Sequence, residues 1–406
     1  MHGVYGNMAE LWEKVLAYDY EREVVELTRN LIAIPSVSGQ EKAVGEFLRS
    51  TMENMGLEVE FQEARKDRPN VIGRVLGKSG KPGLLLNGHM DTIPVGDMEV
   101  DPFGGVVEGG RIYGRGAVDM KGAIAAMVVA AALIKRAGVE LDKGLIVAAV
   151  SGEEAFKNRA GGIGTRYMVK KGIDASAAIV GEATNLDIGI AHIGLMFINI
   201  ICKGRGVHSV DRDRGVNAIL KMVKVINALQ ELGSRLELKR HKLLGRPPVM
   251  NIGIIHGGTL HNWVPDLCRL GIDRRLIPGE TVEEALQQIN ELVERLRRED
   301  SDLTVTFKPR IANRGMEISP DEAVVLAIQK ARGRVLGSYA NLVGIPYGTD
   351  AAILVNEARI PTAIMGPGDF KLLHSRVESV GVKELVDAVK IYTHTALTMC
   401  QHSYIE

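Results

Sequence analysis

The chain has 406 residues, too many for a single hydrophobic core of ordinary size, so we expect two domains. Its 46% hydrophobic and 25% charged content is that of an ordinary globular protein. Fifty basic side chains balance fifty acidic ones, and no long run of one sign occurs. This balance argues against nucleic acid or an anionic membrane surface as the main partner.

The N-terminus, the apolar runs and the cysteines bear on where the protein resides. Residues 1–13 do not show a basic stretch followed by an apolar core, so no secretory signal is predicted. The longest apolar run, residues 123–134, is too short to span a bilayer and predicts a buried helix. Cys202, Cys268 and Cys400 lie far apart and lack metal-site spacing. We therefore expect a cytoplasmic protein with buried, reduced thiols.

The first part of the chain predicts an α/β domain. Helical spacing of apolar and charged residues ends near Leu31 and recurs over residues 41–55. Strand-like apolar segments follow at residues 57–61, 71–76, 84–87, 144–150 and 177–180. The last two are apolar on both faces, which is typical of strands buried in a parallel sheet, with the Ala-rich helix as a crossover.

The pattern changes near Leu195, where a second domain is predicted to begin. Strands are expected at residues 195–202, 249–256, 267–273 and 303–307, and helices at residues 216–232 and 282–299. This βαββαβ order is typical of a compact ferredoxin-like, split βαβ unit. After Pro320 the α/β character returns, with a strand at residues 362–365 and a closing helix from Val382.

We therefore predict a catalytic domain formed by two separate stretches, residues 1–194 and 310–406. Its fold class is α/β, with a mixed, mostly parallel sheet flanked by helices. Residues 195–309 would be inserted as an α+β ferredoxin-like lid and dimerisation domain.

Polar residues follow the predicted buried strands at their C-terminal ends. His89 and Asp91 come after the strand at residues 84–87, and Glu153 and Glu154 after the strand at residues 144–150. Open α/β sheets bind ligands at this edge. Two adjacent carboxylates there are costly unless a cation compensates them. The simpler alternatives are a surface turn for His89 and a solvated acidic turn for the two glutamates.

Three further positions complete the pattern. Asp119 precedes an apolar helix, where N-capping is the alternative function. Glu182 follows the strand at residues 177–180, and His374 lies shortly after the strand at residues 362–365. Two histidines and three carboxylates are what two divalent ions need if one carboxylate bridges them. The five candidate ligands are His89, Asp119, Glu154, Glu182 and His374.

Two acidic residues beside these ligands have other candidate roles. Glu153 is left over next to Glu154, where it can take a proton from a metal-bound water. Asp91 could hold the imidazole of His89 in one tautomer.

Several motifs appear in an order that resembles a known family. They are GHMDTIP (88–94), DPFGG (101–105), GRGAVDMKG (114–122), SGEE (151–154), GEAT (181–184), DRRLIPGE (273–280), GTDA (348–351) and GPG (366–368). The chain resembles the two-zinc metallopeptidases and deacylases, the family of acetylornithine deacetylase, succinyl-diaminopimelate desuccinylase, aminoacylase and the glutamate carboxypeptidases. The similarity covers almost the whole chain.

The resemblance implies a two-metal site in which Asp119 bridges the ions. One metal would be held by His89 and Glu182, and the other by Glu154 and His374. The ions would be zinc, with cobalt and manganese as alternatives.

The resemblance also implies roles for residues that do not bind metal. Glu153 would be the general base, and Asp91 would support His89. In the inserted domain, His208 would reach across a homodimer interface to stabilise the developing oxyanion. Arg275 and Asn262 would hold a substrate carboxylate, for which a guanidinium group is well suited. A structural ion pair with a neighbouring aspartate is the alternative for the arginine.

These expectations favour a metal-dependent hydrolase that cleaves the amide bond of a small N-acyl amino acid with a free carboxylate. One alternative is an exopeptidase, either a carboxypeptidase or a dipeptidase, with the same site. Another is a catalytically silent binding protein, but such a protein has no chemical need for Glu153.

Overall fold

The computed structural model describes residues 10–154 and 161–401, which fall into two compact units. The larger unit comprises Met1–Ile190, Ile318–Val343 and Thr349–Glu406, and the inserted unit comprises Ala191–Glu317 and Gly344–Gly348. The inserted unit thus starts a few residues before the predicted boundary, ends a few residues after it, and gains a short segment that the sequence did not assign to it.

The main mixed sheet has strand order β1-β2-β6-β3-β7-β15-β8-β13, in which β14 also pairs with β8, and the larger unit contributes most of its strands. The strands are β1 (Glu58–Arg65), β2 (Arg68–Val75), β3 (Pro82–His89), β6 (Gly144–Val150), β7 (Ala177–Val180), β8 (Ile188–His192), β13 (Met316–Glu317), β14 (Leu342–Ile345) and β15 (Thr362–Ile364). The central strands β6, β3, β7 and β15 run parallel, whereas β1 and β2 are antiparallel. The predicted fold class is confirmed.

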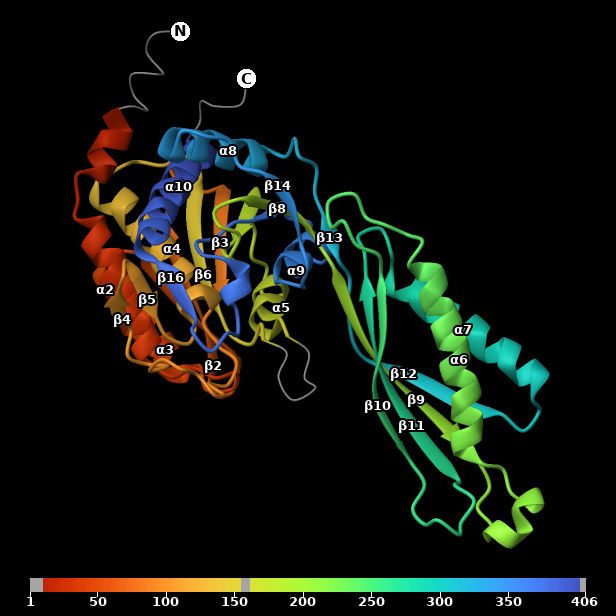
Figure 1. Ribbon diagram of the computed structural model, residues 1–406. Helices are drawn as coiled ribbons and strands as arrows, with labels where there is room; N and C mark the ends of the chain where they lie inside the picture. Colours follow the sequence, from red (N-terminus) through yellow and green to blue (C-terminus); the bar gives the residue numbers. More distant parts are fainter. Residues whose placement is uncertain (1–9, 155–160, 402–406) are drawn as a thin grey trace. The chain divides into compact units, whose positions relative to one another are not determined.

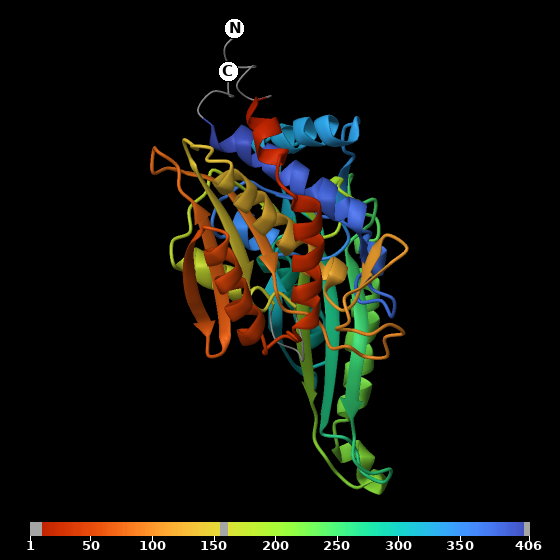
Figure 2. The ribbon, with the colours of Figure 1, turned by 90° about the vertical axis from the view of Figure 1, so that its left-hand side faces the viewer.

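Helices cover both faces of this sheet (Figure 1). They are α2 (Tyr20–Ala33), α3 (Lys42–Asn54), α4 (Gly122–Arg136), α5 (Ile163–Lys170), α8 (Ala323–Leu336), α9 (Ala351–Asn356) and α10 (Val382–Cys400). The apolar helix α4 contacts both α2 and α10, and Figure 2 shows these three helices side by side over the sheet. Although α4 and the turn before it are apolar and long enough to cross a membrane, they are buried in this unit.

The inserted unit is a four-stranded antiparallel sheet with order β10-β11-β9-β12. Its strands are β9 (Gly194–Lys203), β10 (Val249–Gly257), β11 (Leu267–Leu276) and β12 (Thr304–Asn313), with helices α6 (Ala218–Leu236) and α7 (Val282–Glu299) between them in the chain. Buried and exposed residues alternate along β9, as expected when one face of a sheet packs on helices. Apolar residues of both helices and of three strands form its core.

Candidate functional site

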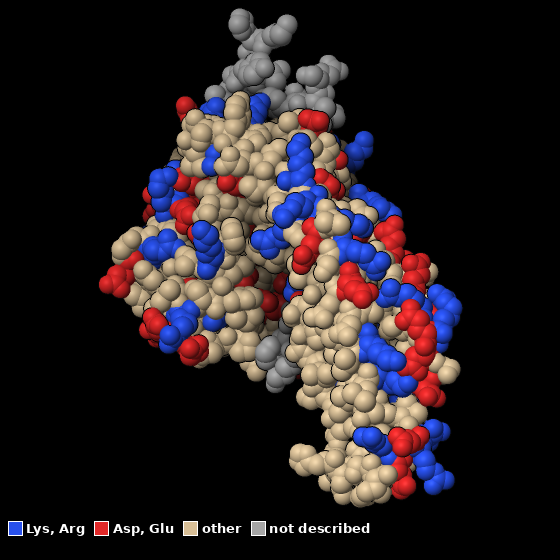
Figure 3. Space-filling view, turned by 45° about the vertical axis from the view of Figure 1, so that its right-hand side comes forward, with Lys and Arg blue, Asp and Glu red and all other residues tan. Residues whose placement is uncertain are grey.

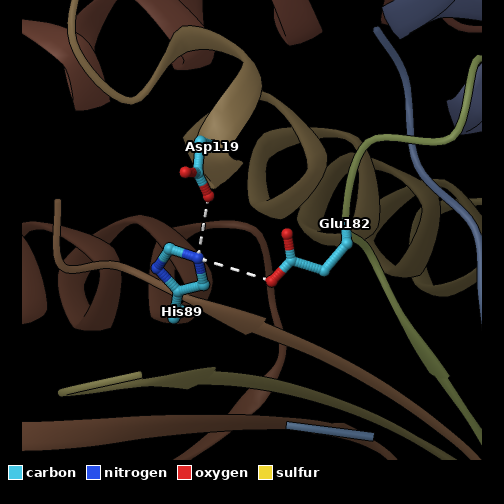
Figure 4. A group of neighbouring side chains, drawn as sticks. All are labelled: His89, Asp119 and Glu182. Carbon is cyan, nitrogen blue, oxygen red and sulfur yellow. Dashed lines mark hydrogen bonds and ion pairs between the residues drawn. The ribbon is translucent and has the colours of Figure 1, made fainter. Parts of the chain in front are cut away.

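His89 is the last residue of β3, and its buried imidazole faces two carboxylates. Nδ1 lies 2.9 Å from the main-chain oxygen of Asp91, to which it can only donate, so the proton of a neutral ring belongs on Nδ1. Nε2 lies 3.1 Å from Oδ1 of Asp119 and 3.6 Å from Oε1 of Glu182 (Figure 4). An unprotonated Nε2 facing two acidic oxygens needs a cation between them.

Asp119 joins two histidines that come from distant parts of the chain. It lies in the short π-helical turn Ala117–Lys121 that leads into α4, and the peptide bond after it is cis. Its Oδ1 faces Nε2 of His89, and its Oδ2 lies 3.0 Å from Nε2 of His374. Each carboxylate oxygen therefore lies next to a different imidazole. A carboxylate that bridges two metal ions has this arrangement.

The second group of side chains forms around His374. Its Nε2 lies 2.9 Å from Oε1 of Glu154, and its backbone adopts a left-handed φ of 59°. Unlike His89, this imidazole is 47% exposed. Hydrogen bonds to Asp119 and Glu154 raise the pKa of His374 to about 10. A proton on this ring takes the position that a metal ion would occupy.

Two groups of possible metal ligands thus share Asp119. The groups are His89, Asp119 and Glu182, and Asp119, Glu154 and His374; within each, the ligand atoms lie within 4.8 Å of one another. Imidazole nitrogens and carboxylate oxygens suit zinc, cobalt and manganese. The residues present therefore fit a pair of divalent ions, and each group contains the residues that the family resemblance implies for one ion.

The electrostatics of the site show why cations would stabilise it. Burial, followed by the charge of Asp119, raises the pKa of Glu182 to about 8. Burial alone would lower the pKa of His89, but the hydrogen bond and charge of Asp119 raise it well above its ordinary value. The raised pKa values of both groups mean that they hold protons more readily, because several neighbouring carboxylates cannot all be ionised without a large electrostatic penalty. Divalent cations would remove this penalty.

Glu153 lies beside the ligands without belonging to either group. Burial raises its pKa well above the ordinary value, and the charges of Glu182, Asp350 and Glu154 add to this effect while His89 opposes it. A carboxylate with a raised pKa holds a transferred proton more readily, as a general base at neutral pH must.

Asp91 positions the turn that carries Glu153. Its carboxylate accepts hydrogen bonds from the main-chain N–H groups of Gly152 (2.7 Å), Glu153 (3.0 Å) and Glu154 (3.1 Å), and from the hydroxyl of Ser38 (2.6 Å). Its Oδ1 lies 3.8 Å from Nδ1 of His89, so Nδ1 donates the hydrogen bond that orients the imidazole to the main-chain oxygen of Asp91 and not to its carboxylate.

The other predicted residues belong to the inserted unit. His208 and Asn262 are exposed neighbours, with 3.4 Å between Nε2 of the histidine and Nδ2 of the asparagine. Arg275 lines a cavity of about 280 Å³ together with Arg246 and Tyr347. Its Nε also pairs with the carboxylate of Asp273 at 3.0 Å, the structural contact that the sequence left open as an alternative.

Sequence reasoning missed two buried acidic residues near the ligands. Asp350 accepts a hydrogen bond from the hydroxyl of Thr165 at 2.6 Å, and its charge acts on Glu153. Glu378 hydrogen-bonds the turn that carries Asp119. Asp350 lies in the GTDA motif, which was a usable signal, whereas Glu378 belongs to none of the motifs.

Comparison with known proteins points to one family. The model of peptidase family M20/M25/M40 matches residues 85–398. Acetylornithine deacetylase of Pectobacterium carotovorum is 32% identical over 394 residues, covering 93% of this chain and 98% of the deacetylase.

Solved structures show the same fold. A tripeptidase of Staphylococcus aureus matches with a TM-score of 0.75 at 25% identity, covering 94% of this chain and 98% of the tripeptidase. A dinuclear metal-binding M20 peptidase of Bacillus subtilis matches with a TM-score of 0.72 at 18% identity, covering 94% and 98%. The similarity thus extends over nearly the full length of each of these proteins.

Proposed function

The chain belongs to peptidase family M20/M25/M40, and on this premise we propose that it is a two-metal amidohydrolase acting on small N-acyl amino acids. The observation that carries the proposal is the position of Asp119, whose two oxygens face His89 and His374, with Glu153 close by and outside both ligand groups. The chain is a metallohydrolase of this family. We propose its substrate class, its metal and its oligomeric state below.

We propose zinc as the metal, with cobalt or manganese able to replace it. His89 and Glu182 would hold one ion and Glu154 and His374 the other, with Asp119 between them. Bound ions supply a water of lowered pKa and polarise the scissile carbonyl.

Glu153 would do the proton chemistry. Its carboxylate would accept the proton of the attacking water and later deliver it to the leaving amine nitrogen. The carboxylate of Asp91 would keep Glu153 in place by accepting a hydrogen bond from the main-chain N–H of Glu153. The same carboxylate also accepts hydrogen bonds from the N–H groups of Gly152 and Glu154. It would therefore position the general base Glu153 and the metal ligand Glu154 together.

Substrate binding would fall to the inserted unit. The guanidinium of Arg275 suits a substrate carboxylate, and Asn262 would assist it. His208 would stabilise the oxyanion that develops on the carbonyl oxygen. The ion pair with Asp273 compensates part of the positive charge of Arg275. The guanidinium would remain charged and could still bind a substrate carboxylate.

The acyl substrate is favoured over a peptide on two grounds. The deacetylase relative is 32% identical over most of this chain, whereas the matching tripeptidase is 25% identical. The family resemblance also implies that Glu182 occupies a position where deacylases tend to have Glu and several peptidases Asp. The similarity to the tripeptidase makes exopeptidase activity the second candidate.

A substrate screen tests the proposal directly. The zinc-, cobalt- and manganese-loaded forms would be assayed on N-acetyl, N-succinyl and N-formyl amino acids and on dipeptides of similar size. We expect the highest kcat/KM for an N-acyl amino acid. Higher values for free dipeptides would establish exopeptidase activity instead, and no turnover by any loaded form would favour a silent binding protein.

We also propose a cytoplasmic homodimer formed through the inserted unit. Strand β10 is the edge of its sheet and exposes Ile254 and Ile255, while helix α6 exposes Leu220 and Val223. An edge strand offers unpaired main-chain groups to a second copy. In Figure 3 the lower lobe carries a broad area without charged side chains beside a charged strip. Such an area suits a two-fold contact, in which His208 would serve the site of the partner.

A further inference from the structure

Glu378 connects the two segments that supply Asp119 and His374. It lies four residues after His374 and is fully buried. Its Oε1 accepts hydrogen bonds from the main-chain N–H groups of Gly116 at 2.8 Å and Val118 at 3.3 Å. The carboxylate thus contacts the turn immediately before Asp119, 260 residues away in the chain.

Two further contacts strengthen this connection. The main-chain oxygen of Glu378 accepts a hydrogen bond from the N–H of Gly114 at 3.1 Å. Its Oε2 pairs with Nη1 of Arg115 at 2.5 Å, and Nη2 of the same guanidinium donates to the main-chain oxygen of Val95. Since Arg115 is itself buried, the charge of Glu378 is compensated inside the protein.

The turn that receives these contacts depends on two glycines with positive φ values. Gly114 and Gly116 adopt φ values of 146° and 88°, a region that favours glycine. The N–H groups of Gly116 and Val118 lie before Asp119 and Met120, whose backbone angles are not helical, so these groups do not belong to helix α4. Glu378 supplies the acceptor for both groups.

We propose that Glu378 is a positioning residue for the metal centre: it fixes Asp119 relative to His374 by holding the Gly114–Val118 turn. The proposal rests on the two-metal function proposed above. Glu378 belongs to neither group of candidate ligands, so it acts through Asp119. His89 is positioned separately, because it ends a central strand and is oriented by Asp91.

A consequence distinguishes this role from general stabilisation. Loss of Glu378 should disturb the group formed by Asp119, Glu154 and His374 more than the group around His89. Residues that support metal ligands commonly alter metal affinity about 10- to 100-fold when removed. The cobalt-binding step of the group around His374 should therefore weaken in Glu378→Gln, and the other step should change little.

The test is a titration of the apoprotein with Co²⁺, followed by visible absorption and by the bound-metal stoichiometry. Glu378→Gln keeps the size of the side chain and an acceptor oxygen but removes the charge opposite Arg115. We expect two ions per native chain; in the variant, we expect one step near its native affinity, the other weakened at least about tenfold, and an altered d–d spectrum.

Glu280→Gln is the matched control. Glu280 also pairs with a buried arginine, Arg274, at 3.0 Å and accepts a main-chain hydrogen bond from Ile277 at 3.2 Å, but in the inserted unit. Its cobalt steps and spectrum should be native, even if the apoprotein melts at a lower temperature. Equal effects of the two substitutions on cobalt binding would overturn the proposal.

Glu378→Asp decides the matter if Glu378→Gln does not fold. It keeps the charge but shortens the reach to the N–H groups, so one cobalt step should be weaker than in the native chain and the spectrum should be altered. Two native cobalt steps in either folded variant would overturn the inference. If the native chain does not bind two ions, the proposed function itself fails, which is a separate outcome.

Discussion

The two regions that the proposed reaction needs are constructed in opposite ways. In the larger unit, His89, Asp119 and Glu182 are buried and face one another within a few ångströms. In the inserted unit, His208 and Asn262 are exposed and make a single long contact with each other. In the proposed reaction, the larger unit would supply preorganised groups for bond breaking, whereas the inserted unit would supply exposed groups for substrate recognition.

The most severe test of this comparison is Glu153→Ala in the larger unit. We expect both metal-binding steps to remain and amide turnover to fall by several orders of magnitude, because general-base help alone is worth about 10² to 10⁴. Metal stoichiometry and kcat would be measured together, with exposed Glu108 changed to alanine as the control. Near-native turnover in Glu153→Ala would remove Glu153 from the reaction.

His208→Ala tests the inserted unit and should cost less. Loss of one oxyanion donor typically lowers kcat about 10²- to 10³-fold. If His208 serves the partner subunit, a mixture of Glu153→Ala and His208→Ala chains should recover part of the native activity through hybrid dimers. Differently tagged chains would show whether hybrids form. Hybrids that form and stay inactive would mean that His208 does not act across an interface.

Arg275→Ala should have a smaller and substrate-dependent effect. Loss of a hydrogen bond to a charged group costs about 1.5–3 kcal/mol, or roughly 10- to 150-fold in kcat/KM. N-acyl amino acids should show this loss, whereas their amides, which lack the carboxylate, should be insensitive. Arg269→Ala, an exposed position on the same strand, is the control. Equal losses on acids and amides would favour a structural role beside Asp273.

The last prediction concerns the pH dependence of folding stability, in which histidines of the two regions should behave differently. Burial lowers the pKa of His192, in the inserted unit, to about 4, in contrast to the raised pKa of His374. Between pH 6.5 and 4 the folded chain therefore binds fewer protons at His192 than the unfolded chain, so stability falls as pH decreases through this window. This amounts to about 2 kcal/mol between pH 7 and 5.

His192→Asn would check that contribution. Asparagine can keep the hydrogen bond that Nδ1 donates to the main-chain oxygen of Ile193, but it does not titrate. Urea unfolding of the native chain and the variant at pH 7 and pH 5 should show a smaller loss for the variant. A loss equal to that of the native chain would mean that His192 titrates normally.

The sequence by itself determined the central strands and the order of elements in the inserted unit, and it indicated the candidate ligands. Strands buried on both faces have continuous apolar segments, and their C-terminal ends meet at one edge of a parallel sheet. The residues at or just after the ends of β3, β6 and β7 are therefore predicted to lie together from the apolar pattern alone. The grouping around Asp119 depended in addition on the family resemblance.

Only the tertiary structure decided what holds those ligands in place. Asp91 lies only two residues after His89, yet its carboxylate accepts hydrogen bonds from the N–H groups of residues 152–154. The carboxylate of Glu378 accepts a hydrogen bond from the N–H of Val118, in the turn before Asp119 and 260 residues away in the chain. Such contacts leave no local periodicity in the sequence, because a buried carboxylate can accept hydrogen bonds from whichever main-chain groups the fold brings near. They depend on how the elements pack, which the pattern of apolar residues specifies only in outline.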